Sequence, residues 1–383
     1  MKKIYIIAGE SSGDFIGAKL MQQLKQQDNL VDFCGIGGSL MESQGLKSLF
    51  SMEKLSVMGF IEVIKKIFMF KKLIKQTALS ILEYNPNILI TIDSLGFNKR
   101  VAKLVKAKNP NIILLHYVAP SVWAWKPKRA IELSHIYNYL FCLFDFELPY
   151  FNFDSLKTYC VGHPIVESGA NLGNPDDLIN KYNLNPTNTY ILLMPGSRIT
   201  EVSRLLPIFS QAISNIQLKY PNVQAILPTL PHLYSYIQSY LQKNNLNYIL
   251  LNNIQDKYNS FKLAKMGLIA SGTASLELSI AQLHTLVAYR VNPISAYIAS
   301  KLIKIKFASI INIVLNKEVI TEYIQQKCNV ANITNYIDNF LQNKYNEANK
   351  TEIYNILHNL GYENFIPSQK ASNIILNILN NKE

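Results

Sequence analysis

Short apolar runs alternate along the chain with longer stretches in which apolar residues recur every three or four positions. Short runs of this kind are typical of buried parallel strands, and the recurring positions are typical of the helices that cover them. The first half predicts strands at residues 4–8, 31–35, 88–92, 112–116, 139–143 and 158–161. A second series follows at residues 190–194, 223–227, 248–251, 266–270 and 285–289. The alternation predicts an α/β protein with parallel sheets.

A polar segment at residues 167–186 separates the two series of predicted strands. We therefore predict an N-terminal domain over residues 1–168 and a C-terminal domain over residues 169–383, each with a doubly wound, Rossmann-like sheet. After Pro293 the pattern is mainly helical. The last predicted helix, at about residues 368–380, has the option of packing back on the N-terminal domain. Open sheets of this kind bind ligands at the carboxyl ends of their strands.

Composition supports two folded domains and restricts the partners. The chain has 383 residues, of which 49% are hydrophobic and 17% charged, so it can bury large cores. Its net charge of +12 implies attraction to an anion, such as nucleic acid, a phosphorylated substrate or an acidic membrane leaflet. Part of the lysine excess belongs to a general Asn-, Ile- and Lys-rich composition. RNA-binding signatures are absent, so nucleic acid is not expected.

Cysteine spacing and the apolar segments bear on location. The four cysteines are Cys34, Cys142, Cys160 and Cys328, which form no CxxC or Cys/His ligand spacing. We expect a reducing compartment, and we expect no metal site and no cofactor. The first apolar run ends at Gly9, too early for a signal peptide, and residues 267–289 carry Glu277 and His284 within the longest apolar stretch. We expect a cytoplasmic protein whose membrane contact, if it has one, is peripheral.

A glycine turn follows the first predicted strand. Its residues are Gly9, Glu10, Ser11, Ser12, Gly13 and Asp14, and a helix begins at once. Glycines allow close approach of a ligand, and free N–H groups at a helix start favour an anion. A tight turn capped by Ser and Asp is the equally weighted alternative. Because GxGxxG spacing is absent, a dinucleotide site is disfavoured.

The next two strands of the first domain end in further candidate residues. Asp93 directly follows the strand at residues 88–92, where a carboxylate could take a proton from an attacking hydroxyl. A helix N-cap is the alternative for Asp93. Trp123 and Trp125, the two tryptophans of the chain, fall in one loop after the strand at residues 112–116. They predict a binding wall, with a structural aromatic cluster as the alternative.

Two loops of the second domain are candidates for binding a nucleoside diphosphate. The strand at residues 190–194 leads into Gly196, Ser197 and Arg198, and Arg198 could hold a pyrophosphate bidentately unless it pairs with Glu201 instead. Small residues follow the strand at residues 266–270, namely Ser271, Gly272, Thr273, Ala274 and Ser275. Glu277, about one helical turn further, could accept both hydroxyls of a ribose, although a buried cap or a surface glutamate would look the same.

Residues 57–75 form a basic amphipathic segment with five lysines. Such a segment can lie in the headgroup plane of a membrane, and a core-facing helix pair with a solvated lysine face is the alternative. Four apolar residues run consecutively at 67–70, more than one helix face can bury. The predicted membrane-facing residues are Val57, Met58, Phe60, Ile61, Ile64, Ile67, Phe68, Phe70, Lys65, Lys66, Lys71 and Lys72.

Taken in order, the motifs closely resemble those of lipid-A-disaccharide synthases. They are AGESSGD, VMGFIEV, ITIDSLGFN, HYVAPSVWAWKPKR, VGHPIVES, LLMPGSR, ASGTASLEL and AYRVNP, and they extend from residue 3 to about residue 328. The resemblance implies a GT-B fold, with two Rossmann-like domains facing each other across a cleft. It also implies metal-independent, inverting transfer from UDP-2,3-diacylglucosamine to 2,3-diacylglucosamine 1-phosphate at the inner-membrane surface, giving a β(1→6)-linked disaccharide and UDP. A homodimer is compatible with the sequence but not required by it.

With this resemblance, Asp93 is our first candidate for the base and Glu10 the second. The turn at Gly9–Asp14 and the two tryptophans are expected to bind the acceptor, and Arg198, Glu277 and Asn312 the donor. Leu95 and Glu167 depart from the family pattern, which has proline and aspartate there. Residues 312–325 are expected to be helical. A UDP-sugar epimerase of similar fold and a non-catalytic membrane-binding protein are the alternatives.

Overall fold

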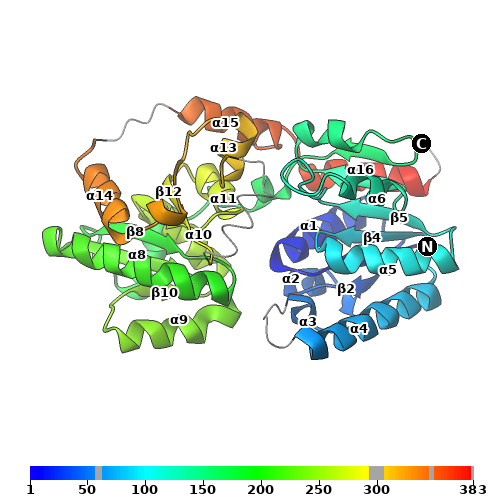
Figure 1. Cartoon of the computed structure of the whole chain (residues 1–383), viewed down its shortest axis with the longest axis horizontal. Helices are drawn as coiled ribbons and strands as arrows, with labels where there is room; N and C mark the ends of the chain where they lie inside the picture. The colour runs from blue at the N-terminus through cyan, green and yellow to red at the C-terminus, as the bar shows by residue number, and fades with distance from the viewer. Residues whose placement is uncertain (57–62, 293–305, 345–348, 381–383) are drawn as a thin grey trace. The chain divides into compact units, whose positions relative to one another are not determined.

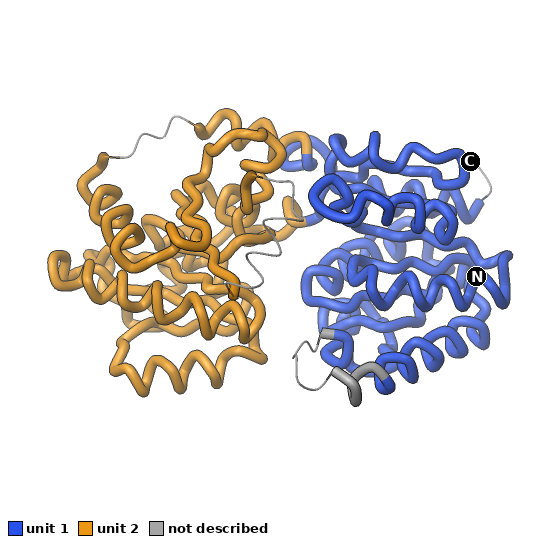
Figure 2. Tube along the Cα trace, viewed as in Figure 1, with its two compact units in different colours: residues 1–164, 360–383 blue, residues 165–359 orange. Residues whose placement is uncertain are grey.

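The computed structural model of the chain (Figure 1) describes residues 1–56, 63–292, 306–344 and 349–380. It divides into two compact units (Figure 2): unit 1 is Met1–Pro164 with Leu360–Glu383, and unit 2 is Ile165–Asn359. Unit 1 thus includes the last helix, α16 (Pro367–Leu379), which packs against α1 (Ser11–Gln27). The Gln27 amide donates to Ser372 Oγ over 2.9 Å at this contact.

Unit 1 is built on a seven-stranded sheet in which all pairs are parallel, with the order β3-β2-β1-β4-β5-β6-β7. The strands are β1 Lys2–Ala8, β2 Val31–Ile36, β3 Lys47–Ser48, β4 Ile88–Ile92, β5 Ile113–Tyr117, β6 Tyr139–Cys142 and β7 Lys157–Cys160. The remaining helices are α2 Ser39–Ser43, α3 Glu53–Ser56, α4 Val63–Tyr84, α5 Leu95–Lys108, α6 Arg129–Ser134, η1 Asp145–Phe151 and η2 Pro164–Glu167, of which η2 spans the boundary to unit 2.

Both faces of this sheet are covered, which explains why its central strands are continuous apolar runs. Every residue of β4 is buried, and in β1 only the first two residues are not. One face packs Tyr5, Leu89 and Leu114 against α4, α5 and α6. Side chains alternate along a strand, and α1 contacts both β1 and β4. These layers hold the carboxyl ends of β1 and β4 in fixed register.

Unit 2 carries a second parallel sheet with the order β10-β9-β8-β11-β12-β13. Its strands are β8 Thr189–Met194, β9 Val223–Pro228, β10 Ile249–Leu251, β11 Met266–Ile269, β12 His284–Tyr289 and β13 Thr321–Ile324. Its described helices are α7 Pro175–Tyr182, α8 Ile199–Lys219, α9 Pro231–Lys243, α10 Ile254–Leu263, α11 Ala274–Ile280, α13 Ile310–Leu315, η3 Gln325–Lys327, α14 Val330–Leu341 and α15 Lys350–Asn359. One face of the sheet forms a core with α8, α9 and α14.

The predicted strands are present, but β3 and β13 were not predicted, and the helical prediction for residues 312–325 is wrong. Residues 312–325 were expected to be helical, whereas α13 ends at Leu315 and β13 follows at Thr321–Ile324. Within the described residues this edge strand pairs with β12 alone, and one of its four residues is buried. A strand covered so little leaves no continuous apolar run in the sequence.

Candidate functional site

Each sheet reverses its strand order at one place, and the predicted site residues follow the strands that meet there. The reversal lies at β1 and β4 in unit 1 and at β8 and β11 in unit 2. Such switch points leave a crevice outside the carboxyl ends of the two strands, and open α/β sheets bind their ligands in it. Gly9–Asp14 and Asp93 follow β1 and β4, while Gly196–Arg198 and Ser271–Glu277 follow β8 and β11.

In unit 1 the loops after β1 and β4 touch. A Cβ atom on Gly9 would lie only 2.5 Å from Ser94 Oγ, so this position requires glycine. Glu10 precedes α1, and Asp93 precedes Ser94; both carboxylate residues are half-buried. The two candidate bases therefore come from adjoining loops on one edge of the sheet.

Asp93 is not the N-cap of α5. That helix begins at Leu95, and its N-cap is Ser94. Asp93 and Ser94 both have left-handed backbone, with φ of 48° and 40°, and the Asp93 N–H donates to the Tyr117 carbonyl over 3.0 Å. The alternative role of Asp93 as a cap is therefore not observed, and the carboxylate stands on a tight turn at the switch point.

The glycine turn after β1 divides into two kinds of residue. Ser11 and Ser12 are exposed in the first turn of α1. Gly13 is buried, and a Cβ atom there would lie 3.3 Å from Ala8 Cβ. Asp14 is buried and accepts hydrogen bonds from the backbone N–H groups of Gly38, Leu40 and Met41 over 2.8, 3.1 and 3.0 Å. Asp14 thus has a structural role at the start of α2, and its predicted acceptor contact stays a prediction.

The two tryptophans have different surroundings. Trp123 is half-buried, its ring lies 5.3 Å from that of Phe146, and its Nε1 donates to Glu147 over 3.3 Å. Trp125 is 36% exposed, with Lys126 Nζ 4.2 Å and Arg129 Cζ 4.8 Å from its ring centre. Trp123 therefore belongs to an aromatic cluster, and Trp125 offers an exposed ring with two cations on it.

Glu147, which the sequence analysis missed, supports Trp123. Its carboxylate is almost fully buried and also accepts from the backbone N–H groups of Leu143 and Phe144 over 3.1 and 3.2 Å. Burial raises the pKa of Glu147 to about 7, although these hydrogen bonds favour the charged form. A single buried carboxylate after a strand produces no periodic pattern in the sequence. Its role was therefore identified from its hydrogen bond to Trp123 in the structure.

In unit 2 the loop after β8 is fixed by Glu201. The Glu201 carboxylate accepts from the Ser197 N–H and from the Tyr289 hydroxyl, each over 3.1 Å, and lies 3.7 Å from Arg198 Nη1. Gly196 has a φ of 128°, which suits only glycine. The alternative pairing of Arg198 with Glu201 is thus present, yet the Arg198 side chain stays 59% exposed beside the start of the 21-residue helix α8.

The loop after β11 surrounds an open position. Gly272 has a φ of 137°, and no atom of the described residues lies within 4 Å of a Cβ atom built on it. Ser271 Oγ donates to the Ala308 carbonyl over 2.6 Å, and Ser275 Oγ donates to the Gly272 carbonyl over 2.8 Å. Thr273 is exposed, and Ala274 begins α11. The serines hold the loop in shape, and Gly272 leaves backbone accessible.

Glu277 is buried and paired. Lys257 Nζ lies 2.7 and 2.8 Å from its two carboxylate oxygens, and the Tyr258 hydroxyl lies 3.4 Å away. A carboxylate has about four acceptor positions, so Glu277 can still accept from a ligand. The two contacts from Lys257 fix the orientation of the carboxylate.

Asn312 is fully buried and occupied. Its Oδ1 accepts from the N–H groups of Val319 and Ile320, and its Nδ2 donates to the Ile320 carbonyl and to Glu322. Glu322, on β13, also accepts from the N–H groups of Ala308 and Ser309. Asn312 therefore shapes the segment that Ser271 contacts, and its predicted donor contact stays a prediction.

The predicted membrane segment is described only in part. Val57, Met58, Phe60 and Ile61 lie outside the described residues, as do the side chains of Ile64, Lys65, Lys66 and Ile67. Phe68 is 71% exposed, and Lys71 and Lys72 are exposed on the same helix. Phe70 packs on Phe97, with ring centres 5.4 Å apart, and so turns toward the core. Within the described residues, none of the helices has the length and apolar character needed to cross a membrane.

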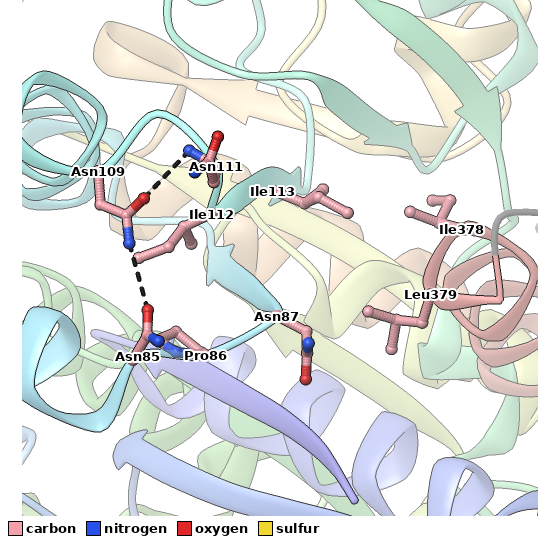
Figure 3. Close-up of a pocket in the computed structure, with 9 residues that line it drawn as sticks. All are labelled: Asn85, Pro86, Asn87, Asn109, Asn111, Ile112, Ile113, Ile378 and Leu379. Atoms are coloured by element: carbon pink, nitrogen blue, oxygen red, sulfur yellow. Dashed lines mark hydrogen bonds between the residues drawn. The ribbon is translucent and has the colours of Figure 1, made fainter.

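A pocket of about 340 Å³ lies at the opposite, amino edge of the unit 1 sheet (Figure 3). Asparagines line one side of it, and Asn109 bonds there to Asn85 and to the Asn111 N–H. The described residues around it carry no titratable side chain, so it offers neither acid nor base. Likewise, the part of the chain that the structure describes contains no group of three or more His, Cys, Asp or Glu placed to hold a metal ion.

Two parallel, Rossmann-like sheets with anion-compatible loops at their switch points define an α/β protein with a GT-B-like fold. In agreement, a UDP-GlcNAc 2-epimerase from Neisseria meningitidis, solved with UDP-GlcNAc, matches with a TM-score of 0.62 over 100% of both chains. Its sequence identity is 14%, so this likeness shows the fold alone.

The family model for lipid-A-disaccharide synthetase matches residues 4–376. A lipid-A-disaccharide synthase of Rickettsia prowazekii is 41% identical over 381 residues, covering 98% of this chain and 99% of the relative. One from Rhodospirillum centenum is 34% identical, covering 98% and 94%. The chain therefore belongs to the lipid-A-disaccharide synthase family, the glycosyltransferases of lipid A biosynthesis. The resemblance of the motifs is confirmed, and the epimerase and non-catalytic alternatives are not supported.

Proposed function

We propose that unit 1 binds 2,3-diacylglucosamine 1-phosphate as the acceptor and supplies the base, and that unit 2 binds UDP-2,3-diacylglucosamine through its UDP. The observation that supports this division is the placement of the candidate residues at the switch points of the two sheets. The loops at the unit 1 switch point carry the half-buried Asp93 and Glu10. Those of unit 2 carry, besides Glu201 and Glu277, the exposed side chain of Arg198 and the backbone at Gly272.

In the proposed reaction Asp93 takes the proton of the acceptor 6-hydroxyl, with Glu10 as the second candidate. The hydroxyl oxygen attacks the anomeric carbon of the donor, and the bond from that carbon to the diphosphate oxygen breaks. UDP leaves with the electron pair, and the configuration inverts because there is one displacement. Arg198 and the first N–H groups of α8 stabilise the negative charge that develops on the leaving diphosphate.

The uridine ribose is assigned to Glu277. Its carboxylate is paired with Lys257 and can accept from two hydroxyl groups. The Ser271–Ser275 loop is assigned to phosphate, since Gly272 leaves its backbone open. Exposed Ser11, Ser12 and Trp125 are the acceptor contacts that we retain.

We further propose a cytoplasmic protein that attaches peripherally to the anionic inner-membrane surface through α4, and in which homodimerisation is compatible with activity. The exposed Phe68, Lys71 and Lys72 support attachment, because an apolar side chain beside lysines suits the headgroup layer.

The test of the substrate assignment is UDP release with acylated and non-acylated donors, each with and without acceptor. We expect disaccharide and UDP only when acylated donor and acceptor are both present. Turnover of the non-acylated donor alone would contradict the lipid substrate, and UDP release or a changed sugar without acceptor would contradict transfer.

A further inference from the structure

The turn that carries Asp93 needs support from outside itself. Asp93 and Ser94 both have positive φ, and neither is glycine. A left-handed conformation is unfavourable for a non-glycine residue, so two in succession persist only where neighbouring groups fix them. The backbone conformation of this turn determines the position of the Asp93 side chain.

Asn98 on α5 binds the carbonyl groups of three consecutive residues of this turn. Its side-chain Nδ2 donates to the Ile92 carbonyl over 3.2 Å and to the Asp93 carbonyl over 2.7 Å. Its backbone N–H donates to the Ser94 carbonyl over 3.2 Å. The amide orientation follows from these partners, because Oδ1 in the place of Nδ2 would face two carbonyl oxygens.

The burial of Asn98 is costly, which argues against a role in packing alone. The residue is fully buried, and its Oδ1 has no hydrogen-bond partner among the described residues. A buried acceptor without a partner destabilises the folded state, whereas an apolar side chain in this place would carry no such cost. The two side-chain bonds to the turn are the benefit that the structure shows.

We infer that Asn98 is a positioning residue for the transfer reaction: it holds the Ile92–Ser94 turn so that the Asp93 carboxylate meets the acceptor hydroxyl. The inference rests on the proposed role of Asp93 as the base. Ser94 also lies against Gly9, so a shift of this turn would disturb the adjoining loop that carries Glu10. The contribution of Asn98 is to the geometry of the base, and it binds no substrate itself.

The experiment compares Asn98→Ala with Val105→Ala, a fully buried position on the same helix that lies away from the turn. For Asn98→Ala we expect kcat to fall at least about tenfold while the donor KM and the UDP affinity stay within about twofold, since small misplacements of a reacting group are costly. Val105→Ala should lower the thermal midpoint and keep kcat. Asn98→Ser, which retains one donor, should fall between Asn98→Ala and the parent, and it serves if Asn98→Ala does not fold.

A double variant separates this inference from the proposed function. If Asn98 acts through Asp93, Asn98→Ala combined with Asp93→Asn should be no slower than Asp93→Asn alone. A kcat of Asn98→Ala or Asn98→Ser equal to that of the parent, or effects that multiply in the double variant, would overturn the role of Asn98 while leaving Asp93 as the base. Normal turnover by Asp93→Asn would overturn both.

Discussion

The carboxylates of the chain differ in burial and in the groups that they bind, and this difference distinguishes structural residues from candidates for chemistry. Asp14 accepts from three backbone N–H groups, and Glu322 accepts from two and from Asn312. Both carboxylates fix loops from within their own unit. Asp93 and Glu10 instead stand half-buried at the switch point of the unit 1 sheet. Residue type and position after a strand predicted Asp14, Asp93 and Glu10 as candidates, whereas Glu322 lies within β13 and was not predicted. Burial then distinguished Asp14 from the two half-buried candidates.

Glu147 leads to a prediction about pH and stability. Its folded-state pKa of about 7 lies above the ordinary value of 4.5, so stability from this group is complete below about pH 4.5 and is lost as the pH rises through 7. The expected loss is on the order of 3 kcal/mol of unfolding free energy. Buried His116 and His163, whose pKa values burial lowers to about 3 and 4, act in the opposite direction.

The measurement is therefore a difference between the parent and Glu147→Gln, taken from chemical unfolding between pH 5 and 8. The free energy of unfolding of the parent, minus that of Glu147→Gln, should decrease as the pH rises, since Glu147 loses its proton and the glutamine does not titrate. A difference that stays constant across this range would show that Glu147 is ionised throughout and that the hydrogen bonds outweigh burial.

Among the elements, those buried on both sides were predictable and those at the edges were not. Strand β4 was predicted with its observed bounds because all of it is apolar and buried. Strand β13 was missed because it is half-covered, and β3 has only two residues. The lack of a sequence pattern also explains why the supporting roles of Glu201, Glu322 and Asn98 were not predicted. Each side chain forms hydrogen bonds with backbone groups of a loop or turn, and these bonds produce no regular spacing in the sequence.

Helix α4 carries the prediction about membrane attachment. Charge reversal by Lys71→Glu with Lys72→Glu should weaken binding to vesicles containing anionic lipid at least about tenfold, since each lysine near such a surface contributes about 1 kcal/mol. Both lysines are exposed, so folding should be unaffected. Cosedimentation with anionic and with neutral vesicles measures the effect.

The matched control is Lys243→Glu with Lys262→Glu, two exposed lysines of unit 2 that make the same change in net charge. Attachment through α4 predicts that the control pair binds vesicles as the parent does. An equal loss in both pairs would assign the effect to the overall positive charge, and no loss in the α4 pair would remove α4 from the proposal.

The whole molecule combines two units, each with its own sheet, core and switch point. In the proposed account this arrangement separates the two tasks of the reaction. Acceptor activation depends on residues of unit 1, and UDP recognition depends on residues of unit 2. A substitution that abolishes acceptor activation should therefore leave UDP binding intact. A substitution that weakens UDP binding should leave the base in place.

The most direct test measures UDP affinity by calorimetry and turnover by UDP release in Asp93→Asn and in Glu277→Gln. Asp93→Asn should lose on the order of a hundredfold or more in kcat while its Kd for UDP stays that of the parent. Glu277→Gln should bind UDP more weakly, because the ribose loses a charged acceptor. Near-normal turnover by Asp93→Asn in a protein that still binds UDP would contradict the account.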